Sequence, residues 1–309
     1  MLRDSNEANN EIRGVVPPII TPFTPDGRIY EQGVGNLIEF QIENGVHALF
    51  AIGSYGSFPL LETDERERLA EMILGRVNGR IPVMVHVGSP LTATAVRLAI
   101  HAAGAGANSV AAVVPFYYAA SAYKDDVILG YFESICTAVD VPVYIYNNPK
   151  TTGFHASPSL VRKLAGVGVS GMKDSSGDFM YMVEVIRQME EADIDFNLMA
   201  GTAGFFQPMF SQGSFACVGG SANTFPEVLV ELYKALRTGC QERASELQSL
   251  VIGIRTVQAI RGFRPASTYA ALRMRGVDVG TVRPPWREPD AEAIQIMESE
   301  FKKLGLITE

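Results

Sequence analysis

The segments that decide the fold are VPVYIY at residues 141–146 and GVSGMK at residues 168–173. Each is short and apolar on both faces, which is typical of a strand buried in a parallel sheet. Parallel strands need a crossover connection, and the residues between the two segments have the composition of a helix. The pair therefore predicts a strand–helix–strand unit.

The same alternation continues outward in both directions. Six further apolar runs complete a set of eight expected strands, at residues 14–20, 46–52, 81–87, 109–114, 195–200 and 214–219. Helical stretches lie between them, and for one we expect Thr63 to be the N-cap and Gly79 to mark the end. Eight such pairs predict an α/β protein with a closed (β/α)8 TIM barrel. The first turn, TPFTPDG, lacks the G-x-G-x-x-G of a dinucleotide-binding sheet.

After about Gly239 no further strand is expected, and the pattern is helical. The helical stretches are residues 241–260, 266–276 and 291–305. We therefore predict a polar N-terminal extension at 1–13, the barrel at 14–238, and C-terminal helices at 239–309 that pack on the barrel as an appendage.

Composition narrows the class of protein. The chain has 309 residues, of which 47% are hydrophobic and 19% charged, so it can bury a large core. The net charge of −8 argues against a nucleic-acid partner. No run of about 20 apolar residues and no secretory signal is visible, so we expect no membrane partner. The three cysteines form no C-x-x-C pair, which fits a reducing cytoplasm.

Lys173 is the first candidate for chemistry, because it ends an apolar strand at the mouth of the predicted barrel. The six other lysines fall in helical or loop segments. Desolvation at the barrel mouth would lower the pKa of the amine and make it a nucleophile for Schiff-base formation. The alternatives are a lysine that extends to solvent or pairs with Asp174.

Aromatic and glycine-flanked residues end the neighbouring strands. Tyr146 ends the strand beside that of Lys173 and could move protons, or could simply fill the core. Tyr144 shares its strand face but lies deeper. The turn G-S-Y-G at residues 53–56 could hold a carboxylate on its backbone N–H groups, although most such turns only connect elements. Tyr117 belongs to an aromatic cluster after the fourth strand.

No cofactor or metal site is predicted. The histidines are isolated and no P-loop is present. The loops after the last two strands, AGTAGFF and GGSANTFPE, contain glycines that could hold a phosphate, but no basic residue accompanies them. A phosphosugar enzyme is therefore the weakest interpretation.

In combination, these motifs resemble the dihydrodipicolinate synthase / N-acetylneuraminate lyase family of class I Schiff-base aldolase barrels. The resemblance runs from about Gly14 to the C-terminus. It rests on the motifs TPF at 21–23, G-S-Y-G at 53–56, PFYY at 115–118, YNNPKTTG at 146–153 and GMKDSSGD at 171–178.

The resemblance implies a role for each matching residue. Lys173 would form the imine with pyruvate or a related 2-oxo acid, and Tyr146 would be the proton-carrying phenol. Ser54 would relay protons to Tyr117 of a neighbouring subunit. The pocket for the carboxylate and the rest of the substrate would include Gly53, Ser54, Tyr55, Thr151, Gly201 and Val218. The family is usually a homotetramer, a dimer of dimers, without a cofactor, and its partners are a 2-oxo acid and an aldehyde.

Departures from the family pattern bear on the substrate. Thr151 stands where dihydrodipicolinate synthases carry an arginine that binds aspartate semialdehyde, and the ammonium of Lys150 cannot reproduce a guanidinium fork. Tyr55 replaces a threonine or asparagine. These changes favour a 2-keto-3-deoxy sugar-acid aldolase or dehydratase, or a hydratase-aldolase, over a true dihydrodipicolinate synthase. A non-catalytic barrel that binds a 2-oxo acid is the alternative from another class.

Overall fold

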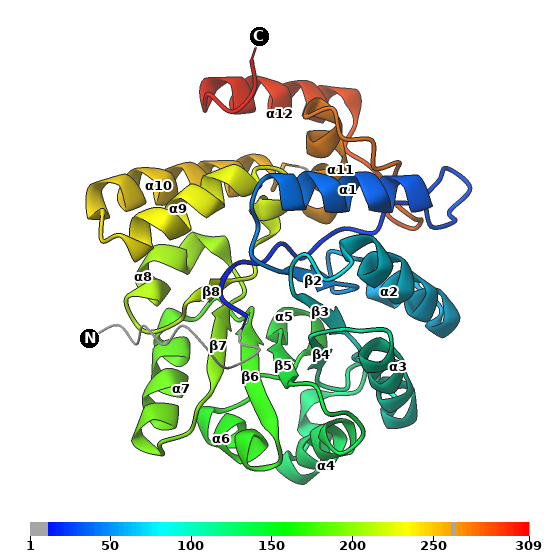
Figure 1. Ribbon diagram of the computed structural model, residues 1–309, viewed down its shortest axis with the longest axis vertical. Coiled ribbons are helices and arrows are strands. Elements are labelled where there is room, and N and C mark those ends of the chain that lie inside the picture. Colours follow the sequence, from blue (N-terminus) through cyan, green and yellow to red (C-terminus); the bar gives the residue numbers. More distant parts are fainter. Residues whose placement is uncertain (1–11, 261–263, 309) are drawn as a thin grey trace.

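The computed structural model describes residues 12–260 and 264–308. Its centre is a parallel sheet with the strand order β1-β8-β7-β6-β5-β4-β3-β2 (Figure 1). The strands are β1 (Gly14–Val15), β2 (Leu49–Ala51), β3 (Val83–His86), β4 (Ser109–Val113), β5 (Val143–Asn147), β6 (Val169–Asp174), β7 (Asn197–Ala200) and β8 (Ala216–Cys217). All eight fall inside the apolar runs or within one residue of them.

Backbone hydrogen bonds between the first two strand regions close the sheet into a barrel. The N–H of His47 donates to the carbonyl of Val15 at 3.0 Å, and that of Phe50 donates to Pro17 at 3.0 Å. Proline has no N–H to donate, which helps to explain why β1 is so short. The (β/α)8 barrel predicted from the sequence is thus confirmed.

Helices surround this barrel, because each carries one apolar face that packs on the strands. They are α1 (Glu31–Glu43), α2 (Thr63–Val77), α3 (Thr92–Gly104), α4 (Asp125–Cys136), α5 (Pro149–Thr152), α6 (Pro158–Gly166), α7 (Phe179–Glu191), α8 (Phe206–Phe210) and α9 (Pro226–Arg237). The N-cap of α2 is Glu62, one residue earlier than expected. Its N–H donates to the carboxylate of Glu65 at 3.0 Å, a contact that Thr63 could not make from inside the first turn.

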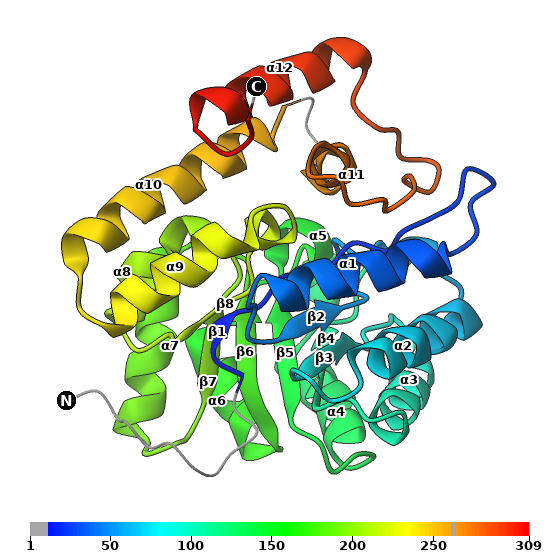
Figure 2. The same cartoon turned by 45° about the horizontal axis from the view of Figure 1, so that its top comes forward.

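The C-terminal helices lie over the carboxyl end of the barrel (Figure 2). They are α10 (Gln241–Val257), α11 (Arg264–Met274) and α12 (Ala291–Lys303). Helix α10 packs on two 3₁₀ turns, η3 (Ala203–Phe205) after β7 and η4 (Gly220–Asn223) after β8, and α11 also contacts η4. This placement brings α10 and α11 to the end of the barrel at which the strands end.

One prediction falls mostly outside the residues that the structure describes. Most of the expected extension, residues 1–11, is outside the described part of the chain. In the described part, none of the helices combines the length and the apolar character needed to cross a membrane.

Candidate active site

Lys173 and Tyr146 are direct neighbours across β6 and β5, at the carboxyl end of both strands. The Cα atoms of the two residues are register partners. Their side chains therefore leave adjacent strands on the same side of the sheet. This is the pair that the sequence predicted.

The Lys173 ammonium is enclosed by aromatic rings. The residue is 3% exposed, and Nζ lies 4.0 Å from the ring centre of Phe50 and 3.9 Å from that of Tyr146. Burial lowers the pKa of Lys173, although Tyr146 opposes the shift. A larger fraction of neutral amine, which is the nucleophilic form, is therefore present at neutral pH than in an exposed lysine.

Asp174 does not pair with Lys173, so that alternative was wrong. Successive residues of a strand point to opposite faces. The carboxylate of Asp174 is fully buried and accepts hydrogen bonds from Asn147 Nδ2 at 2.6 Å and Ser176 Oγ at 2.6 Å. Burial raises the pKa of Asp174, against these hydrogen bonds. The carboxylate ties the ends of β5 and β6 together, and among the described residues no other carboxylate pairs with Lys173.

The Tyr146 hydroxyl is held by two side chains. Its Oη lies 3.2 Å from Ser54 Oγ and accepts a hydrogen bond from Asn148 Nδ2 at 3.2 Å. Burial alone would raise the pKa of Tyr146, but the Lys173 charge and the Ser54 hydrogen bond outweigh it and lower the pKa below its ordinary value. A phenol with a lowered pKa, next to an amine with a lowered pKa, is suited to exchange protons with it.

The turn at residues 53–56 is placed by strain and by tight packing. Ile52 has a φ of +59°, which a β-branched residue rarely adopts. A side chain at Gly53 would come within 2.3 Å of the Phe50 ring. Thr21 Oγ1 donates to the carbonyl of Gly56 at 2.6 Å. Within the described residues, no acceptor is bonded to the backbone N–H groups of Ser54 and Tyr55. These two N–H groups are therefore available as hydrogen-bond donors.

The other predicted wall residues, Gly201 and Val218, come directly after β7 and β8. The N–H of Gly201 donates to the carbonyl of Asp174 at 2.7 Å, and a side chain at this position would come within 2.2 Å of the same oxygen. Val218 is buried, and its N–H donates to Ala200. The glycine is thus required by the close approach of two backbones.

Two predicted residues are not brought into the site within one chain. Thr151 is exposed in α5, and its hydroxyl donates to Asn148 at 3.2 Å. Tyr117 is 87% exposed, has a φ of +96°, and packs edge-on against Tyr118 with ring centres 5.5 Å apart. An exposed aromatic pair held in a strained conformation is typical of an interface.

Three further residues at the site were not predicted from the sequence. His86 lies beneath Tyr146 with ring centres 5.9 Å apart, and burial, with the charges of Arg66 and Lys173, puts its pKa well below the usual value. Asn148 bonds Tyr146, and the NN pair after β5 was the available signal. Arg255 reaches the barrel mouth from α10, which no local pattern indicated.

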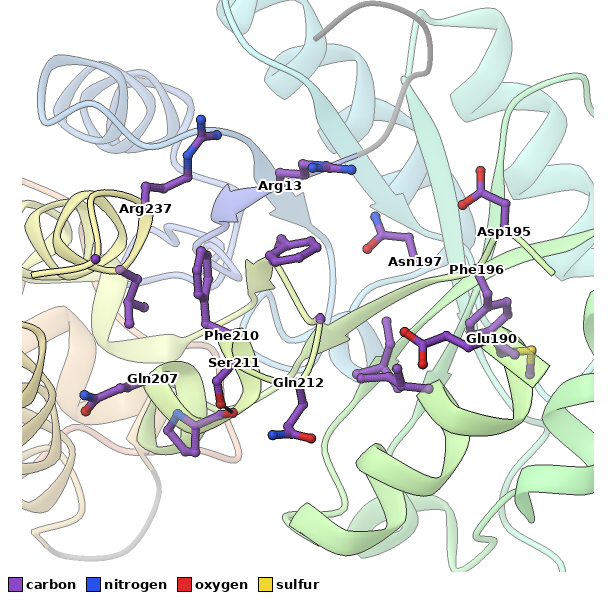
Figure 3. Close-up of a pocket in the computed structure, with 18 of the residues that line it drawn as sticks. Arg13, Glu190, Asp195, Phe196, Asn197, Gln207, Phe210, Ser211, Gln212 and Arg237 are labelled. Carbon is purple, nitrogen blue, oxygen red and sulfur yellow. Dashed lines mark hydrogen bonds between the residues drawn. The ribbon is translucent and has the colours of Figure 1, made fainter. Parts of the chain in front are cut away.

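A separate cavity of about 1440 Å³ lies at the opposite end of the barrel, next to the starts of β7 and β8 (Figure 3). Its walls include Arg13, Asn197 and Phe210. It contains none of the strand-end residues, and this end of such barrels serves stability rather than catalysis. Among the described residues, no group of three side chains is placed to ligate a metal.

A TIM barrel with a desolvated lysine at the end of its sixth strand, beside a phenol, defines the class: this is a lyase that works through a lysine Schiff base. The chain belongs to the Dihydrodipicolinate synthetase family, whose model matches residues 11–304.

Two relatives and one solved structure show the range of the family. A 4-hydroxy-tetrahydrodipicolinate synthase of Methanopyrus kandleri is 32% identical over 97% of this chain and 98% of its own. A probable 2-dehydro-3-deoxy-D-pentonate aldolase of Escherichia coli is 30% identical over 91% and 93%. The structure of YagE, a family member from Escherichia coli in complex with pyruvate, has a TM-score of 0.91 at 28% identity over 95% and 99%. None of these supports a non-catalytic barrel.

Proposed function

We propose that this chain is a 2-oxo-acid aldolase whose nucleophile is Lys173. The observation that carries the proposal is the position of the Lys173 amine, buried between two aromatic rings with a lowered pKa and no paired carboxylate. A carbonyl compound is the reactant that such an amine attacks most readily. The enzyme condenses pyruvate or a related 2-oxo acid with an aldehyde, or cleaves the product.

The proposed reaction passes through an imine and an enamine on Lys173. The Lys173 amine adds to C2 of the 2-oxo acid, and loss of water from the carbinolamine gives the imine. The imine withdraws electrons from C3, so the C3–C4 bond of a 4-hydroxy acid breaks to release an aldehyde and leave the enamine. Tyr146 protonates the departing hydroxyl and accepts the proton of the C4 hydroxyl, with Ser54 as its relay. Protonation of C3 and hydrolysis return pyruvate and free Lys173.

A sugar-acid substrate is favoured over aspartate semialdehyde. Thr151, in the position where an arginine would bind the semialdehyde, donates its hydroxyl back to its own helix. Two Escherichia coli relatives, one named as a probable 2-dehydro-3-deoxy-D-pentonate aldolase and the other, YagE, as a putative 2-dehydro-3-deoxy-D-gluconate aldolase, support the same choice. We propose a 2-keto-3-deoxy sugar acid as the compound that is made or cleaved, with pyruvate as the common fragment.

The test of the proposal is borohydride trapping. Incubation with pyruvate and borohydride should add one reduced pyruvyl group per chain, because the imine on Lys173 is converted to a stable secondary amine. Intact mass and peptide mapping locate the adduct. Labelling of the exposed Lys150 in its place, or the absence of any adduct, would contradict the proposal.

We further propose that Tyr117 serves the active site of a neighbouring copy in a cytoplasmic homotetramer. Lys173→Met and Tyr117→Phe should each be nearly inactive alone. When they are refolded together, half of the dimers are mixed and each carries one site with both residues, so activity should return to about a quarter of wild type. Mixtures that stay inactive while the dimer forms would exclude this role for Tyr117.

A further inference from the structure

We propose that Arg255, assisted by Arg264, forms a binding subsite for an anionic group at the end of the substrate that is remote from the imine. This inference rests on the proposed function and adds the class of substrate. A 2-oxo acid that reaches from Lys173 to this subsite would carry one carboxylate beside the imine and a second carboxylate, or a phosphate, at its remote end.

The face of α10 that carries Arg255 is fixed against the barrel mouth. Gln248, seven residues earlier and so on the same face, donates from Nε2 to the carbonyl of Ala203 at 2.9 Å. Gln258 donates to Thr224 Oγ1 at 2.9 Å. These bonds fix α10 on the loops that follow β7 and β8, with the Arg255 side chain between the two anchors.

The guanidinium lies directly on the loop after β7. A Cβ atom at Gly204 would be 3.3 Å from Arg255 Nε and 3.8 Å from its Cζ, so the glycine leaves the room that this side chain occupies. The next strand in the barrel, β6, carries Lys173. Cys217 lies on β8, the other neighbour of β7, and both cations act on it: burial raises its pKa to about 12, and Arg255 and Lys173 oppose that shift.

Tyr55 connects this region with the carboxylate-binding turn. A side chain at Gly220 would come within 2.2 Å of Tyr55 Oη, so the phenol reaches across to the loop after β8. Burial raises the pKa of Tyr55, and the charges of Arg255 and Arg264 act against the rise. The phenol thus extends from the turn to the loop after β8, near enough to Arg255 and Arg264 for their charges to act on it.

The charges of this pair are not balanced by protein groups. Other arginines of the C-terminal region form ion pairs, as Arg273 does with Glu288 and Arg275 with Glu227. In the described part of the chain, neither Arg255 nor Arg264 pairs with a carboxylate, and Arg255 is half-buried. Burial, followed by the like charge of Arg264, lowers the pKa of Arg255. Arg264 itself is exposed, so the half-buried guanidinium of Arg255 bears the cost of desolvation and of the like charge beside it, and a bound anion would relieve both.

The glycine-containing loops after β7 and β8 have no basic residue of their own, as the sequence shows. Arg255 is supplied instead by a helix more than fifty positions farther along than Gly201. The subsite also gives the enzyme a guanidinium for a second anionic group, although Thr151 provides none at the loop after β5.

The test compares 2-oxo acids that differ only at the remote end. Borohydride trapping is titrated with 2-oxoadipate, which ends in a carboxylate, and with 2-oxohexanoate, which ends in a methyl group. We expect wild-type protein to reach half-maximal adduct at a concentration about 30-fold lower for 2-oxoadipate. Arg255→Gln should abolish this preference while pyruvate is trapped as before. Arg264→Gln should reduce it less, and Arg255→Lys should restore part of it.

The matched control is Arg243→Gln, which removes an arginine from the exposed start of the same helix, where it pairs with Glu246. It should keep the full preference. A third ligand, 2-keto-3-deoxy-6-phosphogluconate, ends in a phosphate. Whether this ligand or 2-oxoadipate is trapped at the lower concentration shows whether the subsite prefers a phosphate or a carboxylate. The subsite alone is overturned if wild-type protein traps pyruvate but shows no preference for an anionic end. It is also overturned if the protein traps pyruvate and none of the longer acids. Failure to trap pyruvate overturns the proposed function.

Discussion

Replacing Lys173 by methionine should lower turnover by about 10⁴-fold or more and abolish borohydride trapping, since no other group can form the imine. The amine is 3% exposed and points between two rings, so no neighbouring lysine can take its place. Turnover is measured by the release of pyruvate from a 2-keto-3-deoxy sugar acid. Lys163→Met is the matched control, because Lys163 is exposed in α6, where it pairs with Asp125 on the surface.

The same variant should not lose stability. Methionine has a similar length and carries no charge, so it avoids the cost of burying an ammonium without a paired carboxylate. Because the folded-state pKa of Lys173 lies below its ordinary value of 10.5, the folded wild type binds fewer protons than the unfolded chain between these two values. The free energy of unfolding of the wild type therefore rises with pH across this interval. The amount by which it falls short of that of Lys173→Met should shrink as the pH rises. Chemical denaturation at several pH values measures the difference. A variant that is inactive because it is unfolded would contradict this account.

Tyr146→Phe should reduce turnover by about 10²- to 10⁴-fold, the usual contribution of a positioned proton donor and acceptor. It should also change the pH dependence of imine formation in a defined direction. Tyr146 raises the pKa of Lys173 against the effect of burial. Without the phenol the pKa of Lys173 falls further, so neutral amine is available at lower pH. In a plot of trapping rate against pH, the rising limb should therefore move to lower pH, and the rate at the plateau should be lower than in wild type.

Tyr144→Phe is the control for this prediction, because Tyr144 lies two residues earlier on the same strand and is equally buried. Its hydroxyl accepts a hydrogen bond from Asn197 Nδ2 at 3.4 Å and lies on the side of the barrel away from the mouth. The control should keep the wild-type pH profile. A limb that stays in place or moves to higher pH in Tyr146→Phe would show that the phenol does not influence the amine as the geometry requires.

The sequence alone determined the barrel and the central pair of the site. Strand and helix follow from the spacing of apolar residues within each segment, and this is local information. Once the strands are parallel neighbours, the residues that end them must meet at one rim. Lys173 and Tyr146 could therefore be placed together before any coordinates were known, and their register confirms it. Side chains alternate between the two faces of a strand, so the sequence also places Asp174 on the opposite face from Lys173. Their pairing could have been excluded on this ground.

Only the tertiary structure decided which distant residues reach that rim. Asn148 and Ser54 meet at the Tyr146 hydroxyl because the loops after β5 and β2 converge there. Arg255 arrives because glutamine side chains dock α10 on the loops after β7 and β8, where Gly204 leaves space for it. These contacts depend on how a separate helix packs against loops, and the periodicity of a segment records only which of its faces is buried, not the partner that covers it.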